Sequence, residues 1–221
     1  MGMHILLIEN NNLAQTESLL TQLQSHDCQV ILAHTPDLAA NKAQTVWPNL
    51  IIFNPVNSRS RLTSYQKALN KIELKVPFMV VSNESELAAV AHTDTIFVTP
   101  NDPQQLIQAI KKAIHRQEDR FIRLPDLIID SREYRLLRHN QCHHLTPKEY
   151  KLLQLLIDHR DHDLSRRAIM KEVWETDYMG DTRTLDVHIR WLREKIEESP
   201  SHPRRLLTIR GIGYRFITNP E

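Results

Sequence analysis

The chain has 221 residues, a length that predicts one large or two ordinary domains. It is 41% hydrophobic and 25% charged, with 28 Lys and Arg against 27 Asp and Glu, and this composition argues against wholesale disorder. No apolar run reaches the roughly 18 residues of a membrane span, and the first residues lack the features of a secretory signal, so no membrane partner is expected. Two distant cysteines, Cys28 and Cys142, predict a reducing, cytoplasmic location.

Strand and helix patterns alternate through residues 1–117, the first predicted domain. The strand candidates are short, nearly continuous apolar runs, as in strands buried on both faces of a parallel sheet. They are His4–Ile8, Gln29–Ala33, Leu50–Phe53, Phe78–Val81 and Thr95–Val98, and the clearest helices are Leu13–Ser25 and Pro103–Arg116. The alternation predicts an α/β fold, a flavodoxin-like domain with a five-stranded parallel sheet.

The pattern changes after residue 117. Residues 118–125 have no hydrophobic period and end in Pro125, which predicts a linker. The second predicted domain, residues 126–221, begins with short antiparallel strands at Leu127–Asp130, Tyr134–Arg138 and His143–Leu145.

Three helices and a hairpin are predicted next. Thr146-Pro147-Lys148-Glu149 is a capping box that starts the first helix, and Ser165 caps a second that runs through Trp174. A third helix starts at Asp181 or Thr182 and ends near Glu198. The strands Leu206–Arg210 and Tyr214–Thr218 flank Gly211-Ile212-Gly213, a pattern typical of a β-hairpin.

Basic charge is concentrated near the C-terminus, where residues 183–217 carry eight Lys and Arg against four Asp and Glu. On a helical wheel, Leu185, Ile189, Leu192 and Ile196 form a core face. The opposite face is centred on Arg183, Val187, Arg190 and Glu194, with Thr184, Trp191 and Lys195 on one shoulder. Arginine donors match phosphate oxygens and guanine acceptors. A helix of this kind followed by a basic hairpin predicts an α+β winged helix-turn-helix.

Several motifs occur in the order of a known family. They are Leu145–Tyr150, Leu164–Arg167, Val173-Trp174, Arg183–Lys195 and Thr208–Phe216. Together they resemble the DNA-binding domain of OmpR/PhoB-type response regulators of two-component systems. The resemblance implies transcription regulation, double-stranded promoter DNA as partner, a homodimer, and a loop at Glu175–Thr182 that touches RNA polymerase.

The resemblance also implies which residues meet DNA. They are Arg183, Thr184, Val187, His188, Arg190, Trp191, Arg193, Lys195, Thr208, Arg210, Gly211 and Tyr214. Asp186 and Glu194 are expected to pair with neighbouring cations rather than with DNA. For Arg166 and Arg167, phosphate contact and a solvated role both remain open.

The domain order predicts that residues 1–117 form a receiver domain. The family's working receivers have an acidic pair, an acceptor Asp, a Ser or Thr, and a Lys; here those places hold Glu9-Asn10, Asn54, Ser82 and Thr99, without the Lys. A carboxamide is a poor nucleophile, and Mg²⁺ prefers anionic oxygen ligands. The sequence therefore predicts an atypical receiver that binds no metal or cofactor and acts without aspartate phosphorylation.

Weaker signals bear on other classes of protein. His139, Cys142, His143 and His144 are metal-ligand types, but neighbouring strand residues point to opposite faces, so polar turn and strand residues are the simpler interpretation. No catalytic triad, Walker loop or dinucleotide motif is found, so an enzyme is not expected. Two alternatives stay open: a ligand- or partner-sensing switch in which the atypical receiver controls the winged helix, and a scaffold that has lost DNA recognition.

Overall fold

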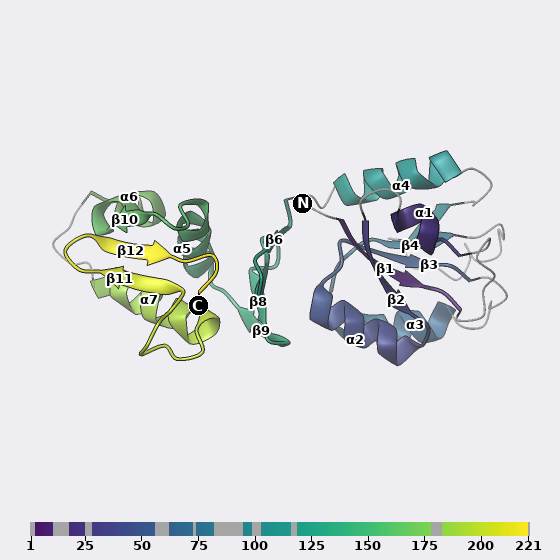
Figure 1. The fold of residues 1–221 in the computed structure, drawn as a ribbon, viewed down its shortest axis with the longest axis horizontal. Coiled ribbons are helices and arrows are strands. Elements are labelled where there is room, and N and C mark those ends of the chain that lie inside the picture. The colour runs from purple at the N-terminus through teal and green to yellow at the C-terminus, as the bar shows by residue number, and fades with distance from the viewer. Residues whose placement is uncertain are drawn as a thin grey trace. The chain divides into compact units, whose positions relative to one another are not determined.

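The computed structural model describes residues 3–10, 18–24, 28–55, 62–72, 74–81, 95–98, 103–115, 119–177 and 183–220. The chain forms two compact units, Met1–Glu118 and Asp119–Glu221. Each unit has its own sheets and its own helices (Figure 1). Within the described ranges, no helix is long and apolar enough to cross a membrane.

The first unit is built on a five-stranded sheet in the order β2-β1-β3-β4-β5, and all its pairings are parallel. Its strands are β1 (Met3–Ile8), β2 (Cys28–Ala33), β3 (Leu50–Phe53), β4 (Phe78–Val81) and β5 (Thr95–Val98). Its helices are α1 (Leu20–Gln24), α2 (Pro36–Val46), α3 (Leu62–Leu69), extended by a 3₁₀ turn at Asn70–Ile72, and α4 (Pro103–His115). The part of the predicted helix Leu13–Ser25 outside residues 18–24 lies outside the described residues.

Helices cover both faces of this sheet because its strands are apolar on both sides. Ile5 and Leu7 of β1 share one core with residues of α1 and α4. The alternate residues Leu6 and Ile8 belong to a second core with residues of α2 and α3. Successive strand side chains point to opposite faces, so the continuous apolar run fills both cores. Figure 1 shows α1 and α4 on one side of the sheet and α2 and α3 on the other.

The second unit begins with a four-stranded antiparallel sheet in the order β6-β7-β8-β9. Its strands are β6 (Phe121–Arg123), β7 (Leu127–Asp130), β8 (Arg135–Arg138) and β9 (Gln141–His144). Three helices and a three-stranded sheet, in the order β10-β12-β11, follow. They are α5 (Pro147–Asp158), β10 (Asp163–Ser165), α6 (Arg166–Trp174), α7 (Arg183–Ile196), β11 (Leu206–Ile209) and β12 (Gly213–Phe216).

The linker prediction for residues 118–125 is wrong for most of its length. Phe121–Arg123 is β6, which pairs with β7 in antiparallel register, Ile122 opposite Ile129. Phe121 is buried, and Arg120 forms a buried ion pair with Asp130 at 2.7 Å. These contacts with β7 and its last residue make the segment the first strand of the second unit.

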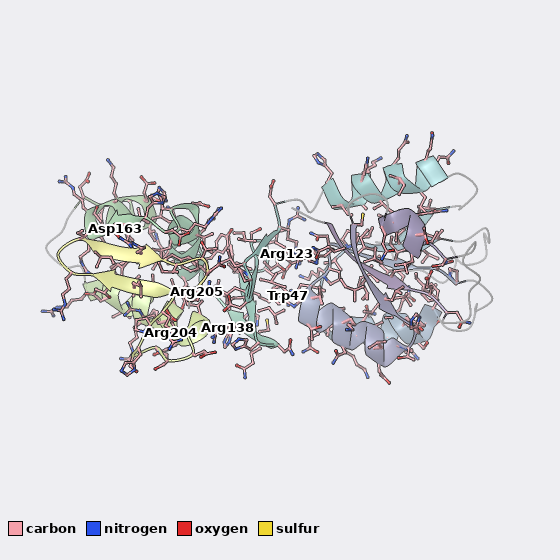
Figure 2. All side chains as sticks on the ribbon, viewed as in Figure 1. Trp47, Arg123, Arg138, Asp163, Arg204 and Arg205 are labelled. Atoms are coloured by element: carbon pink, nitrogen blue, oxygen red, sulfur yellow. The ribbon has the colours of Figure 1, made fainter. Side chains whose placement is uncertain are left out.

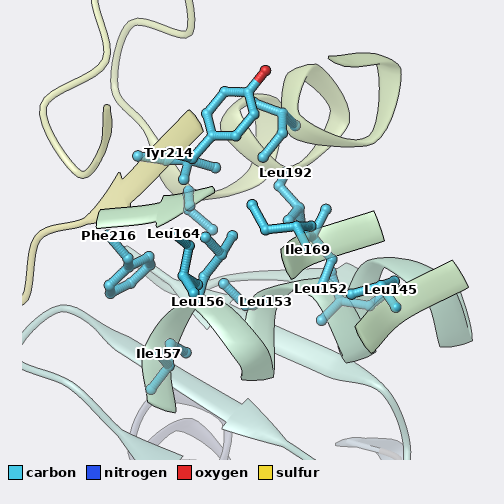
Figure 3. Packing of buried hydrophobic residues seen from close by; sticks show 14 of the residues in the cluster. Leu145, Leu152, Leu153, Leu156, Ile157, Leu164, Ile169, Leu192, Tyr214 and Phe216 are labelled. Carbon is cyan, nitrogen blue, oxygen red and sulfur yellow. The ribbon is translucent and has the colours of Figure 1, made fainter. Parts of the chain in front are cut away.

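The core of the second unit lies between α5, α6, α7, the first sheet and the hairpin. Leu152, Leu153 and Leu156 of α5 form its centre, which Ile169 of α6 and Phe216 of β12 complete (Figure 3). Thr146 and Glu149 form the predicted capping box, and Ser165 caps α6 as expected. The buried positions on three helices explain why their apolar stripes could be recognised from the sequence.

Candidate nucleic-acid interface

Helix α7 presents two distinct faces. Leu185, Ile189, Leu192 and Ile196 are buried, as the wheel predicts. The opposite face carries exposed side chains that include polar, basic and apolar types. They are Arg183, Thr184, Val187, Arg190 and Trp191. The solvent-exposed surface of α7 is therefore partly basic and partly apolar.

Both acidic residues of the exposed surface pair with arginines, which confirms the expectation for Asp186 and Glu194. Asp186 accepts two hydrogen bonds from the Arg166 guanidinium of α6, at 2.8 and 2.9 Å. Those bonds hold the pKa of Asp186 below its ordinary value. Glu194 accepts from Arg190 at 3.1 Å, one turn away on the same helix. Arg166 is thus held in a bidentate pair within the protein.

Tyr214 joins the hairpin to this pair. Its ring is buried, and its hydroxyl donates to Asp186 Oδ1 at 2.6 Å while accepting from Arg166 Nη1 at 3.0 Å. Burial and the neighbouring Asp186 raise the pKa of Tyr214, so the hydroxyl keeps its proton. The three side chains come from β12, α7 and α6, and we call them the Tyr214–Asp186–Arg166 cluster. It fixes the hairpin against both helices.

Two basic residues that the sequence placed at DNA are engaged inside the protein. Arg193 donates to the Leu206 carbonyl at 2.7 and 3.0 Å and to the Thr208 hydroxyl at 2.8 Å. Lys195 pairs at 2.5 Å with Glu149 of the capping box. Burial opposes ionisation of Glu149, but the Lys195 ammonium and the Thr146 backbone N–H lower its pKa overall. Arg193 and Lys195 therefore attach α7 to β11 and to α5.

His188 lies beside two tryptophans. Its ring centroid is 5.1 Å from Trp174 of α6 and 5.0 Å from Trp191 of α7. Its Nδ1 is 2.8 Å from the Thr184 carbonyl. A carbonyl oxygen only accepts, so Nδ1 carries the proton in this contact. These contacts hold the His188 ring against the exposed Trp191 side chain.

The hairpin turn is exposed but attached to the start of α6. Arg210, Gly211 and Ile212 are exposed, and Gly211 has a left-handed φ of +75°. The Ile212 carbonyl accepts from the Arg166 backbone N–H at 3.2 Å. A Cβ on Gly213 would lie 2.1 Å from the Leu164 carbonyl oxygen, so only glycine allows this approach.

Glu197 has a structural role that sequence reasoning missed. Its buried carboxylate accepts from the backbone N–H groups of Arg204, Arg205 and Leu206, the last at 2.7 Å. Its own carbonyl accepts from Arg138 of β8 at 3.2 Å. Figure 2 labels Arg138, Arg204 and Arg205, which lie around this junction between α7 and β11. The signal available in the sequence was only a Glu at the end of an amphipathic helix, a position usually exposed.

In the first unit, the adjacent strands β1 and β3 bring Glu9 and Asn54 together at their carboxyl ends. The Asn54 backbone N–H donates to the Ile8 carbonyl at 2.8 Å. The buried Glu9 carboxylate accepts from the Ser18 hydroxyl at 2.6 Å and the Leu19 N–H at 3.3 Å. The Asn54 amide nitrogen lies 3.4 Å from the same carboxylate.

The structure describes only some of the other residues of this predicted site. Asn10 is half-buried beside Glu9, while Ser82 and Thr99 lie outside the described residues. Across the described part of the chain, no group of three or more His, Cys, Asp or Glu is placed to hold a metal ion. The described part of the site thus holds one carboxylate, Glu9, and two carboxamides, Asn10 and Asn54, of which Asn54 contacts Glu9.

Comparisons with known proteins agree on one family. The family model described as "Transcriptional regulatory protein, C terminal" matches residues 140–216. The alkaline phosphatase synthesis transcriptional regulatory protein SphR of Synechococcus elongatus is 31% identical over 180 residues, 76% of this chain and 70% of that protein. The alkaline phosphatase synthesis transcriptional regulatory protein PhoP of Bacillus subtilis is 30% identical over 222 residues, 90% of this chain and 92% of the relative. The RstA DNA-binding domain of Klebsiella pneumoniae, solved in complex with the RstA box, is 27% identical with a TM-score of 0.42 and covers 45% of this chain and 98% of its own.

Proposed function

The chain belongs to the OmpR/PhoB-type response regulators, a family of DNA-binding transcription regulators, and from this premise we propose that α7 and the β11–β12 hairpin bind promoter DNA sequence-specifically. The observation that carries the proposal is the exposed face of α7, with Arg183 and Arg190, together with the exposed Arg210 of the hairpin. An α-helix fits the major groove, where arginine reads guanine or contacts phosphate. The hairpin would then reach the adjacent backbone or minor groove.

Within this proposal, not all of the twelve predicted DNA-binding residues meet DNA directly. Exposed side chains of α7 and the hairpin turn meet DNA directly, with Arg190 as the leading candidate because its side chain is exposed on the face opposite the core. Arg193, Lys195 and Tyr214 act as positioning residues, since their contacts join α7 to β11, α5 and β12.

The test is DNA binding by the purified, untreated protein, on its own promoter region and at several salt concentrations. We expect the logarithm of affinity to fall linearly with the logarithm of salt, because phosphate contacts release counterions. Arg190→Ala should weaken binding by about 1–3 kcal/mol if the side chain reads a base, and should relax sequence preference there. If it contacts phosphate instead, the salt slope should fall by about one.

Lys67→Ala is the matched control for Arg190→Ala. Lys67 is an exposed cation on α3 of the first unit, so its removal changes the net charge equally. We expect it to keep both affinity and salt slope. An Arg190→Ala protein that binds as tightly as the wild type would remove Arg190 from the interface.

We also propose that the regulator works without aspartate phosphorylation. The position expected of the acceptor holds a carboxamide, which is a poor nucleophile. The Glu9 carboxylate, which would hold a cation in a working receiver, accepts from Ser18 and Leu19 instead. These two observations support an atypical receiver whose activity depends on abundance, partner or ligand.

Incubation with acetyl phosphate and Mg²⁺ tests this. We expect intact-mass and peptide-mass spectra to show no phosphoryl group on the peptide that contains Asn54, and DNA affinity to stay constant. A stable phosphoryl adduct there, or DNA binding that requires the phosphodonor, would contradict the proposal. DNA binding that appears only after removal of residues 1–118 would favour the alternative in which the first unit restrains the winged helix.

Two partners complete the proposal on the basis of the family. Homodimers on tandem half-sites suit a symmetric regulator. RNA polymerase would contact the loop after α6, whose described beginning carries Glu175, paired with Lys151 at 2.9 Å, and Asp177, 3.8 Å from Arg167. These pairs keep charged groups at the surface where that loop starts.

A further inference from the structure

Three of the large hydrophobic side chains that are exposed in the described part of the chain lie on the proposed DNA-binding surface: Val187, Trp191 and Ile212. Among the described residues, five large hydrophobic side chains are exposed: Leu38, Tyr134, Val187, Trp191 and Ile212. Two of them, Val187 and Trp191, lie on the solvent face of α7, 41% and 43% exposed. They are four residues apart and therefore neighbours on the helix surface. We call them the Val187–Trp191 stripe.

The stripe is held in place. Trp191 contacts the His188 ring at 5.0 Å, and His188 contacts Trp174 of α6 at 5.1 Å. His188 is also bonded to the Thr184 carbonyl of the preceding turn. Val187 is β-branched, which limits its rotamers on a helix. An apolar surface ordered before binding loses little side-chain entropy when it meets a ligand.

Polar side chains lie around the Val187–Trp191 stripe on the surface of α7. Arg190 directly follows Ile189 in the sequence. Its side chain is 79% exposed and pairs with Glu194. Arg183 lies one turn before Val187 and is also exposed. The basic groups suit phosphate on either side, whereas Val187 has no side-chain donor or acceptor. Val187 and the carbon atoms of the Trp191 ring therefore suit an apolar feature of the groove better than a hydrogen-bonding base edge.

We propose that the Val187–Trp191 stripe reads the C5-methyl groups of thymine in the major groove. The inference rests on the proposed DNA binding by α7 and specifies what its centre recognises. Thymine is the one standard base that presents an apolar group in the major groove, and apolar side chains contact it there. Burial of one methyl group contributes roughly 0.8 kcal/mol, which corresponds to about fourfold in affinity.

Deoxyuridine substitution tests this directly, because it removes the methyl group and keeps base pairing. Duplexes are first selected from a random-sequence pool with the full-length protein. Each thymine of the selected site is then replaced by deoxyuridine, one at a time, and affinity is measured by fluorescence anisotropy. We expect one or two positions at which uracil weakens binding roughly fourfold each.

The variants Val187→Ala and Trp191→Ala assign the methyl groups to the stripe. Each should bind the thymine duplex more weakly and lose the uracil penalty at its own position, while far-ultraviolet circular dichroism stays unchanged. Leu38→Ala is the matched control: it truncates an exposed apolar side chain of α2 in the first unit and should keep the whole penalty.

Three results would overturn the inference. Tight selective binding with no uracil penalty at any thymine would refute methyl reading while leaving the proposed function intact. A uracil penalty that persists unchanged in both stripe variants would assign the methyl contact to other residues. No selective binding to any duplex would refute the proposed function and this inference together.

Discussion

Glu197→Ala is expected to destabilise the second unit by roughly 3–5 kcal/mol, since it leaves buried backbone N–H groups without an acceptor. The Glu197 carboxylate accepts from Arg204, Arg205 and Leu206, and it is buried. Alanine supplies no acceptor, and the buried site gives water little access to the freed donors. Hydrogen exchange should show the largest loss of protection in β11 and at the end of α7.

The neighbouring Glu198→Ala is the control. Glu198 is exposed, and its oxygen lies 3.9 Å from Arg138, too far for a strong pair. An exposed pair of this kind contributes about 0–1 kcal/mol, so protection in β11 should hardly change. Peptides from the first unit give an internal reference in both variants. Equal effects of the two substitutions would show that the carboxylate contacts of Glu197 do not stabilise the hairpin.

Gly213→Ala is expected to cost roughly 3 kcal/mol or more, because the new methyl group meets backbone that cannot move independently. The added Cβ would lie 2.1 Å from the Leu164 oxygen and 2.9 Å from the Arg166 nitrogen. Relief requires β12 to move away from β10. That movement would also disturb the Tyr214 hydroxyl in the Tyr214–Asp186–Arg166 cluster. We therefore expect both a lower melting temperature and weaker DNA binding.

Gly211→Ala separates steric overlap from backbone strain. Gly211 has φ +75°, but a Cβ there meets no atom within 4 Å. Its cost should be about 1 kcal/mol, the usual penalty for a left-handed non-glycine residue. The comparison is made by thermal unfolding of the two variants and the wild type. A smaller effect at Gly213 than at Gly211 would contradict the close approach of the hairpin to β10.

The sequence predicted those helices and strands whose own residues form a recognisable apolar pattern. Leu50–Phe53, Phe78–Val81 and Thr95–Val98 are continuous apolar runs, and the structure has strands with those bounds. It did not predict β6 or β10. Each has three residues, and β10 pairs with β12 fifty residues later, Leu164 opposite Tyr214. β6 pairs with the neighbouring β7, whereas β10 depends on a distant strand, and three residues are too few to show a hydrophobic period in either case.

The candidate site, too, could be predicted from the sequence only in part. The solvent face of α7 followed from its wheel, because burial of Leu185 and Ile189 fixes which side is outside. The sequence did not predict that Arg193 and Lys195 bind partners within the protein. Their partners, the Leu206 carbonyl and Glu149, lie 13 and 46 residues away along the chain. The tertiary fold therefore decides which basic side chains remain available to a ligand.

The contact between Asn54 and Glu9 also constrains how this unit can change in evolution. The Asn54 amide nitrogen is 3.4 Å from a Glu9 oxygen, and both residues are buried. An aspartate at position 54 would place two carboxylates side by side, and like charges so close resist simultaneous ionisation. Such a variant would be less stable unless a cation-binding change arose with it. The contact between the Asn54 amide and the Glu9 carboxylate therefore favours a neutral side chain at position 54.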